Sequence, residues 1–273
     1  MARFSGMRTT SGVTTSPGPS TVLHVPHASV TIPADVRPTY GLSGAVLKLE
    51  LLRMTDRYTD ELFALEPALA TAVVFPVSRL VVDSERFLDD AMEPMVARGM
   101  GVLYTHTSQR TPLRPPPSPT EREQLLAQWY HPHHARLTEA VEAVLLNRGT
   151  CLVIDCHSFA SAPLPYELDQ SPDRPEICLG TDAFHTPSEL VEVARRAFEE
   201  AGFSVALDRP FAGALVPLRY YQRAPRVRAL MVEVNRGLYM DEATGARLEG
   251  FAGVQLRLAQ VLRRVIAFAE KLP

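Results

Sequence analysis

The stretch that decides the fold is CLVIDCHSF, residues 151–159. It opens with the apolar run CLVID, whose length is typical of a buried strand and which ends in an acid. The segments TVLHVP (21–26) and ALMVEV (229–234) have the same character. Helical segments alternate with these strands along the chain, so the sequence predicts an α/β fold with a largely parallel sheet.

Three further elements are predicted from local pattern. Apolar residues at helical spacing predict a helix over Ser43–Glu66, which Pro67 ends. Thr120 and Glu123 form a predicted capping box, opening a helix that runs to about Asn147 and that Pro132 is expected to kink. Residues 79–83 are predicted to form a short strand.

Length and composition predict a single domain over residues 21–273, preceded by a loose tail over 1–20. The chain has 273 residues, of which 46% are hydrophobic and 22% charged, and its net charge is -3. No apolar run reaches the roughly 20 residues of a membrane span, and the first 20 residues lack a signal peptide's apolar segment. Three cysteines do not make a complete disulfide framework. We therefore expect a soluble, cytoplasmic protein without nucleic-acid or membrane partners; the sequence leaves its oligomeric state open.

Polar side chains at the ends of the predicted strands indicate a metal site. His27 follows the first strand, His157 the strand at 151, and Glu233 lies in the strand at 229. Ligand sites of open α/β sheets lie at the carboxyl ends of the strands, and catalytic zinc typically takes three nitrogen or oxygen ligands. We predict His27 and His157 as ligands and Glu233 as general base. The third ligand is Asp56 or, alternatively, His24.

Other chemistries are disfavoured. The sequence contains no G-x-S-x-G, G-x-G-x-x-G or P-loop motif. Pro132 interrupts the histidines at 131, 133 and 134, so they are not expected to form a three-histidine site. Cys156 neighbours His157 in a strand and should point to the opposite face, into the core.

Seven segments occur in the order found in the N-formylglutamate amidohydrolase family, which the chain resembles over about residues 23–242. They are HVPHAS, TDRYTDELF, VSRLVVDSERF, YHPHHARL, IDCHSF, LDRPFAGALVP and MVEVNRGLYMDE. The family is similar to zinc carboxypeptidases and aspartoacylases. The resemblance implies a three-layer α/β/α sandwich with a mixed, largely parallel sheet, in which a zinc-activated water attacks an amide carbonyl.

The resemblance also implies site residues. His27 and His157 correspond to zinc-binding histidines and Glu233 to the general base. Carboxypeptidase-type relatives have a glutamate three residues after the first histidine, but this chain has Val30 there, so Asp56 is the expected third ligand. Either Arg86 or Arg79 is expected to bind the substrate's carboxylate and help to orient it, and the other residues expected to hold substrate are His134, Ser158 and Arg236.

Two departures from the family pattern bear on the substrate. Glu85 and Asp208 stand where the family has asparagine. Both add negative charge, which predicts a substrate less negative than N-formylglutamate. A third departure, His133 for a tyrosine, adjoins His134.

The function implied is Zn²⁺-dependent hydrolysis of a small N-formyl or N-acyl amino acid, such as N-formylglutamate, to formate and the amino acid. Histidine catabolism is the usual setting of that family. The alternatives are a carboxypeptidase-like peptidase or deacylase acting on another N-acyl amino acid or peptide, and a metal-free binding protein on the same fold.

Overall fold

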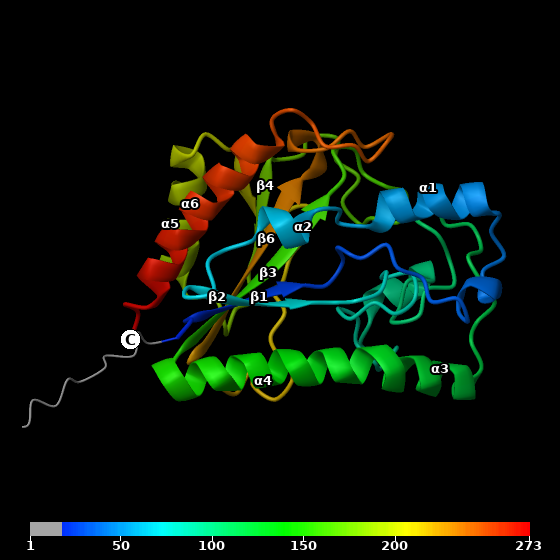
Figure 1. Cartoon of the computed structure of the whole chain (residues 1–273), viewed down its shortest axis with the longest axis horizontal. Coiled ribbons are helices and arrows are strands. Elements are labelled where there is room, and N and C mark those ends of the chain that lie inside the picture. The colour runs from blue at the N-terminus through cyan, green and yellow to red at the C-terminus, as the bar shows by residue number, and fades with distance from the viewer. Residues whose placement is uncertain (1–17) are drawn as a thin grey trace, which may run out of the picture.

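A six-stranded mixed sheet forms the centre of the molecule (Figure 1). The computed structural model describes residues 18–273, so the predicted tail lies outside the described residues except for 18–20. The strands are β1 (Thr21–Val25), β2 (Ala70–Val74), β3 (Cys151–Phe159), β4 (Ile177–Gly180), β5 (Val205–Leu207) and β6 (Val227–Asn235). Their order is β2-β1-β3-β6-β4-β5; the first four are mutually parallel, and β4 runs antiparallel to β6.

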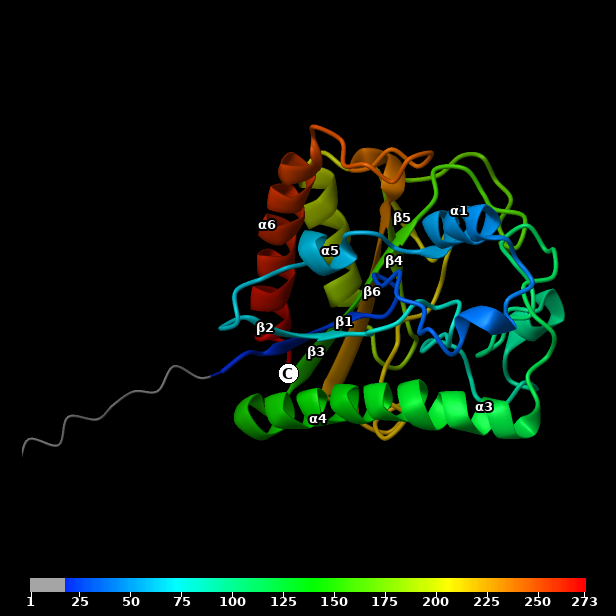
Figure 2. The ribbon, with the colours of Figure 1, turned by 45° about the vertical axis from the view of Figure 1, so that its right-hand side comes forward.

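Helices cover both faces of the sheet, which gives the three-layer α/β/α arrangement that was predicted. They are α1 (Gly44–Met54), α2 (Thr59–Leu62), α3 (Pro119–Leu125), α4 (His131–Arg148), α5 (Ser188–Glu200) and α6 (Phe251–Ala269). The long helix α4 lies along one face, and α5 and α6 pack on the other (Figures 1 and 2). Within the described part of the chain, no helix combines the length and apolar character needed to cross a bilayer.

The alternation of side chains along the central strands places the polar residues on one face. In β3, Leu152, Ile154 and Cys156 join the core under α5 and α6, whereas Val153 packs under α4. Because successive side chains in a strand point to opposite faces, Asp155 and His157 share the α4 side with Val153. Cys156 is fully buried on the other side, as predicted.

The helix predicted over residues 43–66 is broken, and the break positions Asp56. The structure has α1 and the short α2, separated by residues 55–58. Thr55 adopts an extended backbone that ends α1, and Tyr58, with a left-handed φ of 68°, directly precedes α2. The Asp56 N–H donates to the carbonyl oxygen of His27 at 3.0 Å. Apolar spacing could not reveal the break, because residues on both sides of it face apolar surroundings.

The segment after β2 is a chain of turns rather than the strand predicted over residues 79–83. Its apolar residues Leu80, Val81 and Val82 are fully buried, but they pack in a separate cluster with Met54 and Tyr104. The apolar run therefore fills a core beside the sheet, and it carries Asp83 and Arg86 toward the carboxyl ends of the strands.

The second long helix also differs in detail from the prediction. The capping box consists of Ser118 and Glu121, and a π-helical turn over Leu126–Tyr130 separates α3 from α4. The helical backbone continues without a gap from Pro119 to Arg148, and Pro132 closely follows the π-helical turn, so the predicted long helix forms with its irregularity next to Pro132.

Candidate functional site

A cavity of about 350 Å³ opens at the carboxyl ends of β1, β3 and β6. His157 on β3 lies in register with Glu233 on β6, and His27 follows β1. The predicted site residues that line the cavity are His27, Asp56, Arg79, Arg86, His157, Ser158, Glu233 and Arg236. Residues 53 and 85 also line it, whereas His134 is not among its lining residues. The fold thus brings together residues that lie more than 200 positions apart in the sequence.

Asp56 links both histidines to an arginine. Its Oδ2 atom lies 3.2 Å from His157 Nδ1 and 3.7 Å from His27 Nδ1, and its Oδ1 accepts from Arg236 Nη2 at 2.7 Å. Burial raises the pKa of Asp56, but its contacts with the two histidines and Arg236 outweigh burial and hold the pKa well below its usual value. Asp56 is therefore an anion that faces two imidazole nitrogens at once.

Asp83, which the sequence analysis did not single out, organises the other side of His27. Its Oδ1 atom accepts from His27 Nε2 at 2.9 Å, and its Oδ2 accepts from Arg79 Nη2 at 2.9 Å and from the Tyr104 hydroxyl. It is fully buried, and Arg79 and His27 outweigh that burial to keep its pKa well below the usual range. The acid that ends the apolar run LVVD was a usable signal, of the same kind as the acid ending CLVID.

His24, the alternative third ligand, is held by other residues. Its Nδ1 atom lies 2.8 Å from Asp155 Oδ1 and 3.3 Å from Glu85 Oε1, and its Nε2 lies 2.8 Å from His133 Nε2. Burial lowers the pKa of His24, but Asp155 and Glu85 reverse that effect and raise it to about 9. His24 thus lies between two carboxylates, and ligand atoms of His24, Glu85 and Asp155 lie within 4.8 Å of one another, a second group that could hold a metal ion.

Glu233 projects a carboxylate oxygen that nothing in residues 18–273 satisfies. Its Oε2 atom is buried without a hydrogen-bond partner, although the side chain lines the cavity. Burial, together with the nearby Asp56, raises its pKa to about 8 against the opposing effect of His157. A carboxyl group with a pKa near neutrality both takes and returns protons readily.

The three predicted arginines differ in how many of their donors are engaged. Every nitrogen of Arg236 donates within the protein: to Ser158 Oγ, to the carbonyl oxygens of residues 53 and 158, and to Asp56. Arg86 donates only through Nε, to the Met100 carbonyl oxygen at 3.3 Å; its two Nη atoms make no hydrogen bond within residues 18–273. Arg79 likewise leaves Nη1 without a hydrogen bond to those residues. Arg86 therefore keeps two unbonded Nη atoms and Arg79 keeps one, whereas all three nitrogens of Arg236 are engaged and one of its five N–H groups remains.

Two residues expected to influence the substrate lie elsewhere. His134 Nε2 is 2.8 Å from the Ser84 carbonyl oxygen, a contact that braces the segment leading to Arg86. Asp208 accepts from the backbone N–H and the hydroxyl of Thr181 at 2.8 and 2.7 Å, and it is exposed. Asp208 thus closes a turn outside the cavity, which removes it from the argument for a less negative substrate.

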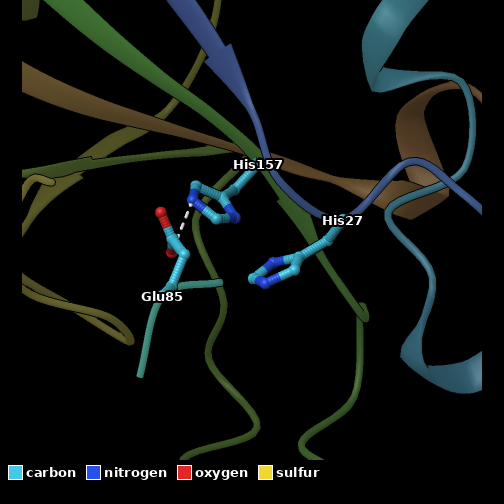
Figure 3. A group of neighbouring side chains, drawn as sticks. All are labelled: His27, Glu85 and His157. Carbon is cyan, nitrogen blue, oxygen red and sulfur yellow. Dashed lines mark ion pairs between the residues drawn. The ribbon is translucent and has the colours of Figure 1, made fainter. Parts of the chain in front are cut away.

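Several buried atoms around the cavity fit a metal ion. His27 Nδ1 and Glu233 Oε2 are buried without a hydrogen-bond partner in the described chain, and His157 Nε2 and Glu85 Oε1 have ion pairs but no hydrogen bond there. Ligand atoms of His27, Glu85 and His157 lie within 4.8 Å of one another, and Figure 3 shows these three side chains gathered together. Imidazole nitrogens with carboxylate oxygens are a donor set that suits zinc. Orphaned buried polar atoms are costly, and a cation would satisfy them.

Comparisons with known proteins agree with this fold. A family model described as N-formylglutamate amidohydrolase matches residues 20–240. An N-formylglutamate deformylase of Pseudomonas aeruginosa is 28% identical over 207 residues, which cover 73% of this chain and 76% of that protein. The crystal structure of an N-formylglutamate amidohydrolase from Ralstonia eutropha superposes with a TM-score of 0.81 at 26% identity, covering 92% of this chain and 94% of that one. A gene product of Agrobacterium tumefaciens shares the fold, with a TM-score of 0.66 at 21% identity over 92% of this chain and 90% of its own.

Proposed function

Because the chain belongs to the N-formylglutamate amidohydrolase family, we propose that it is a zinc-dependent hydrolase that cleaves the amide bond of N-formylglutamate. Its products would be formate and glutamate. The observation that carries the proposal is the unsatisfied, buried Glu233 carboxylate in the same cavity as two histidines and an anionic Asp56. Those are the groups that hydrolysis of an unactivated amide requires.

His27, Asp56 and His157 are the residues proposed to hold the metal. Asp56 Oδ2 lies 3.2 Å from His157 Nδ1 and 3.7 Å from His27 Nδ1, so one oxygen of Asp56 is near both imidazoles. Arg236 holds the other oxygen of Asp56, donating from Nη2 to Oδ1 at 2.7 Å. When bound, Zn²⁺ supplies a Lewis acid for the scissile carbonyl and makes water a better nucleophile at neutral pH.

Glu233 is proposed as the general base and acid. Its Oε2 takes a proton from the attacking water as the new bond to the formyl carbon forms. It then passes that proton to the amine nitrogen as the carbon–nitrogen bond breaks. A pKa raised toward neutrality suits both steps, because neither proton transfer is then strongly uphill.

The guanidinium of Arg86 is proposed to bind the substrate's carboxylate, assisted by Arg79. Their unengaged donors face the cavity, and a guanidinium pairs with a carboxylate through two parallel hydrogen bonds. Asp83, within 3.6 Å of Arg86 Nε and 2.9 Å of Arg79 Nη2, orients both side chains. Binding there would hold the scissile amide at a fixed position relative to Glu233.

Replacing Arg86 by alanine should raise KM for N-formylglutamate by roughly 10- to 150-fold, since a charge-assisted hydrogen bond contributes about 1.5–3 kcal/mol. Steady-state kinetics measure this. Arg196→Ala, on the exposed face of α5, is the control and should change nothing. An unchanged KM in the Arg86 variant would remove that residue from substrate binding.

The proposed function is tested by incubating the purified protein, loaded with Zn²⁺, with N-formylglutamate and measuring formate and glutamate. We expect release of both in equal amounts, loss of activity on chelation, and recovery on adding Zn²⁺. Release of amino acids from peptides or from other N-acyl amino acids, without action on N-formylglutamate, would favour the peptidase or deacylase alternative. Absence of metal binding and of any turnover would leave a binding protein.

A further inference from the structure

Glu85 occupies a position between the two halves of the histidine cluster. Its Oε2 atom lies 3.0 Å from His157 Nε2, the ion pair drawn in Figure 3, and its Oε1 lies 3.3 Å from His24 Nδ1. The side chain is largely buried, with 14% of its area exposed. The two carboxylate oxygens of Glu85 thus face two different histidines.

His157 faces carboxylates from both of its ring nitrogens. Its Nε2 atom lies 3.0 Å from Glu85 Oε2 and 3.2 Å from Asp155 Oδ1, and its Nδ1 atom lies 3.2 Å from Asp56 Oδ2. An imidazole that gives its Nδ1 lone pair to a cation keeps its proton on Nε2. In that state Glu85 Oε2 is placed to accept a hydrogen bond from Nε2.

His27 shows the same arrangement with a different acid. Its Nε2 atom pairs with Asp83 at 2.9 Å, while its Nδ1 has no hydrogen-bond partner and faces Asp56 Oδ2 at 3.7 Å. Both Nδ1 atoms therefore converge on one oxygen of Asp56, and both Nε2 atoms point at carboxylates. A metal-binding histidine usually has its second ring nitrogen bonded to a carboxylate, carbonyl or water, which fixes its tautomer and orientation.

We propose that Glu85 is a positioning residue that fixes the tautomer and orientation of His157 for metal binding, as Asp83 does for His27. The inference rests on the proposed metal site. Two other roles for Glu85 are possible. It could be a metal ligand itself, because its oxygen lies within 4.8 Å of ligand atoms of His27 and His157, or it could contact the substrate. A positioning role for Glu85 is favoured because its Oε2 approaches Nε2 of His157, the ring nitrogen that does not face Asp56. Its other oxygen, Oε1, forms an ion pair with His24.

The buried histidine pair explains how this chain accommodates an additional acid. His24 Nδ1 lies between Glu85 and Asp155, and His24 Nε2 lies 2.8 Å from His133 Nε2. Burial, together with the neighbouring His24, lowers the pKa of His133 to about 2. His24 therefore pairs with both Glu85 and Asp155, while Glu85 also lines the cavity.

The proposal is tested by measuring Zn²⁺ affinity in competition with a chromophoric chelator, for Glu85→Ala, Glu85→Gln and the unaltered protein. Losing an outer-shell carboxylate costs roughly 10- to 100-fold in metal affinity, so we expect a loss in that range for Glu85→Ala. Glu85→Gln, which keeps an oxygen acceptor, should lose less. The visible spectrum of the Co²⁺-loaded variants should keep the band positions of the unaltered protein. Circular dichroism shows whether each variant is folded.

Glu93→Gln is the matched control, because Glu93 is a buried acid of the same segment that bonds the backbone amides of residues 87 and 95 and does not line the cavity. It should leave metal affinity unchanged. A shifted Co²⁺ spectrum in Glu85→Gln would overturn the proposal in favour of a direct ligand. Unchanged affinity in both Glu85 variants with a raised KM would overturn it in favour of a substrate contact. If the unaltered protein binds neither ion, the proposed metal site itself fails, which is a distinguishable result.

Discussion

Glu233→Gln is expected to lower kcat for N-formylglutamate by about 10³-fold or more, with KM little changed. The substitution keeps the shape of the side chain but removes its ability to accept a proton, and general base catalysis contributes roughly 10²- to 10⁴-fold. Glu233 also returns the proton to the leaving amine in the proposed reaction, which places its effect toward the upper end of that range. Steady-state kinetics on the Zn²⁺-loaded variant measure the loss.

Folding and metal content separate a catalytic role for Glu233 from a structural one. Its Oε2 atom makes no hydrogen bond within residues 18–273, so the amide should fit without loss of partners, and replacing a buried carboxyl by an amide should not lower the thermal midpoint. Zn²⁺ content should stay stoichiometric. Glu167→Gln is an informative comparison, since Glu167 also lines the cavity but is paired with Arg174. Full activity in Glu233→Gln would reject the assignment even if the metal is present.

Asp56→Ala is expected to have the largest combined effect on metal binding and stability. Zn²⁺ affinity should fall by more than the roughly 10- to 100-fold that removal of an outer-shell partner costs, because a ligand is lost. Arg236 would remain buried with one partner missing, and breaking a buried ion pair from one side costs about 3–5 kcal/mol. Chelator competition measures the first quantity and urea-induced unfolding of the metal-free protein the second.

Asp56→Asn and His24→Gln complete this test. Asparagine keeps an oxygen for Arg236, so Asp56→Asn should recover part of the stability while metal affinity stays low. His24→Gln should retain tighter metal binding than either Asp56 variant, because both nitrogens of His24 are engaged with other residues. The reverse order of affinities, with His24→Gln the weaker binder, would make His24 the third ligand.

The two acids that departed from the family pattern have separate explanations in the structure. Asp208 caps a turn at Thr181, and Glu85 is held between His157 and His24. Asp208 lies outside the cavity, whereas Glu85 lines it, so the expectation of a less negative substrate rests on Glu85 alone. Arg86 and Arg79 offer unengaged donors in the same cavity, which suits a substrate with carboxylates, such as N-formylglutamate.

The α/β class, the carboxyl-end location and the pairing of His27 with His157 and Glu233 follow from sequence pattern. Buried strands of an open sheet are recognisable as short apolar runs, and reactive residues at their ends must meet at one edge of the sheet. Strand periodicity also predicted that Cys156 would point away from His157. These inferences depend only on local pattern and on the geometry common to all parallel sheets.

The tertiary structure alone decided how each of these side chains is engaged. Asp56 was expected on a continuous helix, but a break after α1 brings its backbone to His27. The role of Asp83, the engagement of all three nitrogens of Arg236, and the meeting of Glu85 with His24 all depend on contacts between segments far apart in the chain. Sequence pattern reports which face of an element is buried; which hydrogen-bond partner a buried polar atom finds is fixed only when the elements pack.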